Sequence, residues 1–238
     1  MKRLLALACL LVSPAALAEP VKLGHTIGPA GITCTEVRSS VVKASANGRN
    51  VEQKDNVAKT IEILAVGPTA VSKAKVTYTA YGKGDAIVGQ SYLVAFDKGT
   101  VKLARADGKP LSPEEEKLLA KDNKRFGKPD VFAEALVGIA FEKGKKTVIP
   151  AEKLATWEEF PQPIAASMTL LERKGATATF TVQLKAGSPG GQQLSLKGTA
   201  VLDIATGRVL SLDGDGVFSD AKVTGTIHTA STEACGKS

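Results

Sequence analysis

The feature that most constrains the fold is a long stretch, Ala176 to Leu212, in which apolar residues recur at every second position. Even-numbered positions from 176 to 184 are apolar and odd-numbered ones are polar, and the even-numbered pattern returns from 194 to 204. A period of two places one set of side chains on a core face and the other in water. Turn sequences at 187–191 and 206–208 separate the runs. The stretch therefore predicts an antiparallel meander in which one face of the sheet is buried and the other is exposed to solvent.

The first half of the chain shows further strand patterns. They cover 36–46, 51–66, 74–81, 91–96 and 100–105, and Asn47-Gly48 is a strong hairpin signal between the first two. β-branched residues favour a strand over 51–66, although its first part is also compatible with a helical turn. The sequence thus predicts two β-rich halves, at about 19–110 and 164–238.

Helical signals lie between these halves. Ser112 is a good N-cap, Pro113 suits the first helical position, and Glu115 occupies the capping-box position of a helix that would run to about Arg125. Asp130 can cap a second helix, with apolar residues on one face from 131 to 139. We predict a helical insertion at about 111–140 and a connector with one short strand at about 141–163.

Together these patterns predict the fold class. It is α+β and mostly antiparallel β, with a curved or half-barrel sheet and a short helical pair inserted midway. The length of 19–238 fits a single β-rich domain.

The N-terminus has the pattern of a secretory signal peptide. A basic start precedes a short apolar run, and Ala16-Leu17-Ala18 is a small-x-small cleavage site. We predict that residues 1–18 are removed between Ala18 and Glu19, leaving a periplasmic or secreted protein. Cys9 lies in a poor lipobox, so plain cleavage is expected. The apolar run is too short for a membrane span, and no later segment approaches the required length.

Two cysteines remain after this cleavage, Cys34 and Cys235, near the two ends of the chain. An even number of cysteines in an exported protein favours a disulfide. The alternative is a reactive or metal-binding pair, but the chain has no CxxC motif and no histidine beside either cysteine.

Charge and composition argue against nucleic acid as a partner. The net charge of +7 falls to +5 once Lys2 and Arg3 are removed, and the positive residues are scattered among negative ones. The densest basic run, Lys143-Gly144-Lys145-Lys146, is typical of a solvated turn. Nucleic-acid binding would call for a basic stripe with stacking aromatics, whereas aromatic residues make up 5% of this chain.

Motifs that would carry catalysis or bind metal are missing from the sequence. His25 and His228 lie near the termini, where a disulfide could bring them together, but no HExxH or GxSxG motif accompanies them. Asp213-Gly214-Asp215-Gly216 resembles the start of a calcium loop, yet Thr224 stands where the twelfth-position glutamate is needed. We interpret this segment as a turn or bulge within a hairpin. No catalytic residue, metal ligand or cofactor site is predicted, and the protein is not expected to be an enzyme.

The combination of a curved sheet and inserted helices suggests a ligand site. Helices laid across the concave side of such a sheet are a common way to hold an apolar molecule, although they can also simply cover the core. The apolar residues that we expect to face such a ligand are Leu118, Phe132, Leu136, Phe180, Val182 and Leu202.

An architectural resemblance is carried by the alternating runs 74–81, 176–184 and 194–204, the Thr206-Gly207-Arg208 turn and the helical region 112–139. With these features the chain resembles the lipoprotein-carrier superfamily (LolA-like and LppX-like) of exported bacterial envelope proteins. The resemblance implies a carrier or binding role for an acyl chain or a lipoprotein. Two alternatives stay open. One is a structural or assembly factor of the envelope that binds an envelope protein through a sheet edge. The other is a hydrolase with an unrecognised site.

Overall fold

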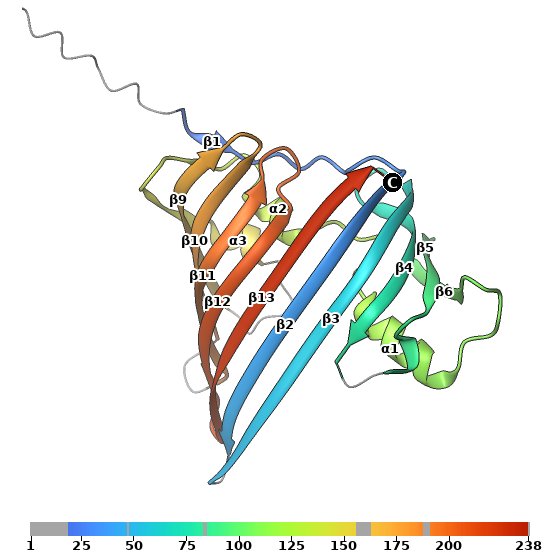
Figure 1. The fold of residues 1–238 in the computed structure, drawn as a ribbon. Helices are drawn as coiled ribbons and strands as arrows, with labels where there is room; N and C mark the ends of the chain where they lie inside the picture. The colour runs from blue at the N-terminus through green and yellow to red at the C-terminus, as the bar shows by residue number, and fades with distance from the viewer. Residues whose placement is uncertain (1–18, 47, 83–84, 156–162, 188–190, 238) are drawn as a thin grey trace, which may run out of the picture.

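The computed structural model describes residues 19–46, 48–82, 85–155, 163–187 and 191–237. The predicted signal peptide and part of the predicted connector, including Trp157, lie outside these ranges. The described part is dominated by one 11-stranded sheet (Figure 1). Its strands are β2 (Ile32–Ala46), β3 (Arg49–Val66), β4 (Val71–Tyr81), β5 (Ser91–Asp97), β6 (Thr100–Arg105), β8 (Lys146–Ile149), β9 (Ile164–Lys174), β10 (Thr177–Gly187), β11 (Gln193–Asp203), β12 (Val209–Ser219) and β13 (Val223–Lys237).

The remaining elements are short. The α-helices are α1 (Pro113–Asp122), α2 (Val131–Leu136) and α3 (Ala151–Leu154), and η1 (Asp85–Ile87) is a 3₁₀ turn. Two further strands, β1 (Val21–Lys22) and β7 (Ala140–Phe141), pair only with each other.

The large sheet is antiparallel throughout, and the first and last long strands of the chain are neighbours at its centre. Its order is β6-β5-β4-β3-β2-β13-β12-β11-β10-β9-β8, so the two halves of the chain meet where β2 pairs with β13. The sheet is strongly curved, and β6 and β8 remain unpaired edges, so it is not a closed barrel (Figure 1). The prediction of a mostly antiparallel β fold is confirmed. Residues 51–66 lie entirely within strand β3, so the helical alternative for the start of this segment is wrong.

The alternation of apolar and polar residues predicted correctly which face of the strands in the second half of the chain is buried. Phe180 on β10 and Leu202 on β11 are fully buried, and their even-numbered neighbours share one hydrophobic cluster with them. Phe141 packs edge-on against Phe180, with 5.0 Å between ring centroids. The odd-numbered residues lie on the opposite, convex face, as the pleat requires.

The helices pack against two different hydrophobic clusters. Leu119 of α1 belongs to a cluster with Tyr78 of β4 and Tyr92 of β5, whereas Leu136 of α2 belongs to the Phe180 cluster and α2 also contacts α3. The expected helical pair is therefore not confirmed, because each helix covers its own half of the sheet. Both helices are shorter than predicted and end at Asp122 and Leu136.

The predicted capping box at the start of α1 is confirmed. Ser112 Oγ accepts a hydrogen bond from the Glu115 N–H (3.2 Å), and the Glu115 carboxylate accepts one from the Ser112 N–H (2.7 Å). The same carboxylate accepts from the Tyr92 hydroxyl and the Arg105 guanidinium, both at 2.7 Å. Glu115 therefore joins the helix start to β5 and β6.

Glu115 should make the fold sensitive to acid. The Ser112 backbone N–H, followed by the Tyr92 hydroxyl, lowers the pKa of Glu115 from 4.5 to about 2. A pKa that is lowered on folding contributes stability above pH 4.5, and this contribution is lost as the pH falls towards 2. We expect Glu115→Gln to lower the free energy of unfolding at pH 7 by about 2 kcal/mol and to flatten its decline below pH 4.5. Urea unfolding at several pH values tests this. Glu116→Gln, exposed on the same helical turn, should leave the pH profile unchanged.

One sequence interpretation is wrong. Asp213-Gly214-Asp215-Gly216 is not a turn or bulge but lies in the middle of β12. Asp215 pairs with His228 on the convex face, while Gly214 is buried on the other face. Acidic and glycine residues alternate here because one face of β12 meets solvent and the other meets the molecule's interior.

Candidate ligand-binding site

An apolar cavity of about 370 Å³ lies on the concave side of the sheet, between α2 and the strands of the second half. Its volume is at the lower end of the range of about 300–1,000 Å³ that is usual for small-molecule sites. The walls consist almost entirely of aliphatic and aromatic side chains. They include Val131, Phe132, Leu136, Ile149, Ala166, Met168, Val182, Leu184, Leu196, Ala200 and Leu212.

Two glycines form part of the cavity's floor. Gly198 of β11 and Gly214 of β12 are direct cross-strand partners, and both line the cavity. A Cβ at Gly198 would lie 2.4 Å from the Asp213 carbonyl oxygen and 2.8 Å from the Gly214 Cα, so the strands can approach this closely only without a side chain there. Glycine at both positions therefore allows β11 and β12 to approach closely beneath the cavity, and no side chain projects into the cavity from this pair.

The structure distributes the six predicted ligand-facing residues over three environments. Phe132, Leu136 and Val182 line the cavity. Phe180 and Leu202 are fully buried in the core cluster and do not line it. Leu118 is on α1 and lines a separate groove.

That groove, of about 820 Å³, lies between α1 and the central strands and is mostly polar. Five basic and three acidic side chains line it. It adjoins the apolar cavity, because Arg125 and Thr229 line both. The concave side thus offers an apolar space with a polar one beside it.

A network of charges fixes α1 over the central strands. The Asp122 carboxylate, whose side chain is only 2% exposed, accepts from Arg38 of β2, Lys59 of β3 and the Tyr78 hydroxyl, each at 2.7 Å. Glu36 completes the network by pairing with Arg38 (3.0 Å) and Lys59 (3.5 Å). Burial raises the pKa of Asp122, but the charge and hydrogen bond of Lys59, together with the Tyr78 hydroxyl and the Arg38 charge, outweigh this effect, so the pKa is lowered overall. No local sequence pattern predicts this network, because its members lie on β2, β3, β4 and α1.

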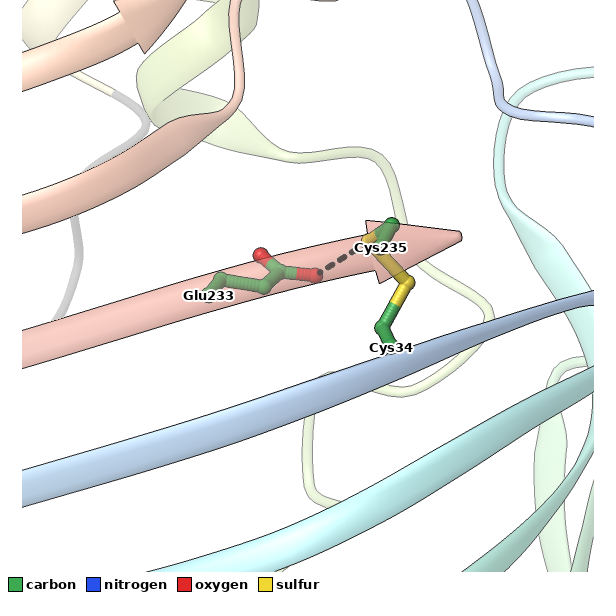
Figure 2. Close-up of side chains that lie close together, drawn as sticks. All are labelled: Cys34, Glu233 and Cys235. Atoms are coloured by element: carbon green, nitrogen blue, oxygen red, sulfur yellow. Dashed lines mark hydrogen bonds between the residues drawn. A yellow bond between two sulfur atoms is a disulfide. The ribbon is translucent and has the colours of Figure 1, made fainter. Parts of the chain in front are cut away.

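The predicted disulfide is confirmed. Cys34 and Cys235 are direct partners across β2 and β13, and their sulfur atoms are bonded (Figure 2). Glu233 Oε1 lies 3.5 Å from Cys235 Sγ, so these three residues are a potential set of metal ligands in the described part of the chain. However, Arg208 pairs with Glu233 and its guanidinium lies 3.9 Å from Cys34 Sγ. A fixed positive charge at this position disfavours a cation.

The disulfide does not bring the two histidines to one site. His228 is on the convex face, where its Nδ1 lies 3.0 Å from Asp215 Oδ1. Ser195 shares this shallow surface depression, but it is two strands away, about 10 Å at the usual strand spacing. A serine nucleophile must lie within hydrogen-bond reach of its histidine. His228 and Ser195 are therefore too far apart to act as a catalytic histidine–serine pair.

His25 instead lines a third, smaller cavity of about 260 Å³ next to the disulfide. The segment that contains His25 is bound to the turn after β11 by a hydrogen bond of 2.7 Å, which the Gly24 N–H donates to the Ile204 carbonyl. Both His25 ring nitrogens are buried without a hydrogen-bond partner in the described structure. Arg125 and Asp130 line both this cavity and the apolar one.

In the ranges that the structure describes, no helix is both long enough and apolar enough to cross a membrane. Fold and site together define an open antiparallel sheet with an apolar cavity on its concave face. The sequence matches no model of a known protein family, and no curated protein matches it.

Proposed function

We propose that this chain is an exported, non-enzymatic binding protein that holds an apolar ligand, such as an acyl chain, in the cavity beneath α2. The observation that carries the proposal is the cavity itself: about 370 Å³ with walls of aliphatic and aromatic side chains and a glycine floor. Burying an apolar chain there would contribute about 0.8 kcal/mol per CH₂ group. The disulfide suits an oxidising compartment, in agreement with the predicted signal peptide and a periplasmic or secreted location.

The alternative role, binding an envelope protein through a sheet edge, has less support. Edge strand β6 carries Lys102 and Arg105, and edge strand β8 begins with Lys146. Charged residues on edge strands, lysine above all, discourage the addition of another strand.

Filling the cavity should abolish ligand binding. Val182 is half-buried and lines the cavity, so Val182→Trp would occupy the space that a ligand needs. We expect the wild-type protein, purified without detergent, to bind the uncharged dye Nile red, and Val182→Trp to bind it at least about ten-fold more weakly. Fluorescence titration measures this.

Val217→Trp is the matched control, because Val217 is 57% exposed on β12, on the convex face. It should bind the dye like the wild type. Circular dichroism would establish that both variants are folded. Equal affinity in the two tryptophan variants, or a wild type that does not bind the dye, would contradict the proposal.

A further inference from the structure

We infer that the ligand is an amphiphile with a single apolar chain and an anionic head group, and that Arg125 binds this head group. The inference rests on the proposed function and specifies its ligand class. Its starting point is the position of Arg125, which lines the apolar cavity, the polar groove and the small cavity of His25. A molecule whose chain fills the apolar cavity would present its polar end at this junction.

The volume of the apolar cavity argues for one chain. At about 370 Å³ it is close to the smallest sites that hold organic ligands, and Phe132 of α2 and Ile149 of β8 are among the residues that line it. Several chains side by side would need a larger space.

The charges around the junction favour an anion. Arg125 lies just after α1, and its neighbours in sequence include Lys121 in the last turn of α1 and Lys124 and Lys128 beyond it. Asp122, the one acidic residue among them, is already paired with Lys59 and Arg38, and the adjoining groove as a whole carries five basic against three acidic side chains. Asp130 also lies at this junction and keeps its negative charge; its carboxylate accepts the Phe132 and Ala133 N–H groups at the start of α2 and interacts electrostatically with Arg208, a second cation that lines the small cavity.

His25 supplies an independent indication of a polar ligand group. A buried imidazole without hydrogen bonds is costly, because its polar atoms have lost water and gained nothing in exchange. His25 lines the small cavity together with Arg125. An oxygen of an anionic head group held by Arg125 could accept a hydrogen bond from the His25 ring.

The test compares ligands of equal chain length and different heads. Palmitate, hexadecyl phosphate and hexadecanol, each below its micelle concentration, would displace Nile red from the wild type at pH 8. We expect at least one of the anions to bind about ten-fold more tightly than the alcohol, as a hydrogen bond to a charged group implies, and this advantage to shrink with added salt. The preferred anion distinguishes a carboxylate from a phosphate head.

Two variants locate the head group. Arg125→Gln should remove most of the anion's advantage and leave hexadecanol binding unchanged. His25→Phe should weaken anion binding several-fold without lowering the melting temperature, because it removes an unpaired polar group. Lys117→Gln, exposed on α1 outside all three linings, is the control and should change neither affinity.

The failures of the two proposals can be told apart. If acids and alcohol bind equally well, or if Arg125→Gln weakens them equally, the head-group inference is wrong and the apolar site stands. If the dye binds but none of the three ligands displaces it, the head-group inference is wrong, whereas a dye that does not bind at all contradicts the proposed function as well.

Discussion

Replacing both Cys34 and Cys235 with serine is expected to lower the free energy of unfolding by about 5 kcal/mol. The two cysteines are separated by 201 positions, so their bond closes nearly the whole of the chain that the structure describes into one loop. In the chain-entropy model, such a loop greatly restricts the unfolded state, and the restriction grows with loop length. The bond also joins the first and last long strands at the middle of the sheet, where the two halves of the chain meet.

Urea unfolding of the serine variant, compared with the wild type, measures this loss. Wild-type protein treated with a reductant should show the same shift in midpoint, and the serine variant should not respond to the reductant. A serine variant as stable as the wild type would mean that the hydrogen bonds between β2 and β13 hold the halves together without help from the disulfide.

The second large effect is expected at Asp122. Asp122→Asn should cost about 3–5 kcal/mol, the usual penalty for breaking a buried ion pair by removing one partner. Lys59 is only 7% exposed, and without the carboxylate its charge would remain buried with the more distant Glu36 as its nearest counter-charge. The loss should be measured by urea unfolding at pH 7, where the lowered pKa keeps Asp122 fully ionised.

An exposed pair on the same sheet provides the control. Asp97 and Lys102 form an ion pair in which both side chains are about half exposed, and Asp97→Asn should cost less than about 1 kcal/mol. The double variant Lys59→Met/Asp122→Leu removes both buried charges, so it should lose less than the sum of the single variants. If Asp122→Asn were no more destabilising than Asp97→Asn, the network would be incidental to the position of α1.

Much of the fold could be predicted because its signals are local. Alternation in β10 and β11 identified the buried face down to Phe180 and Leu202, and Ser112 and Glu115 marked the start of α1. The disulfide followed from an even number of cysteines remaining once the predicted signal peptide is removed. The same local reasoning failed at Asp213–Gly216, where four residues typical of a turn lie within a strand, because cross-strand pairing outweighed their intrinsic preference.

The candidate site was harder to predict. Periodicity indicates which side chains share a face, but it does not indicate whether that face is closed over at a given position. Phe180 and Val182 lie on the same face of one strand, yet the first is enclosed by the core and the second lines the cavity. No sequence pattern indicated that Arg125 belongs to the site, because basic residues are common just after a helix.

By itself, then, the sequence determined the strands, their buried faces, the helix cap and the covalent link, because each of these depends on the chemistry of neighbouring residues or on a simple count. Only the tertiary structure decided where the two helices lie, where Gly198 meets Gly214, and that Asp122 reaches Lys59 and Arg38, 63 and 84 positions away. These features arise when the curved sheet brings distant segments together, and no local pattern specifies which of many possible neighbours a buried charge or a glycine will meet.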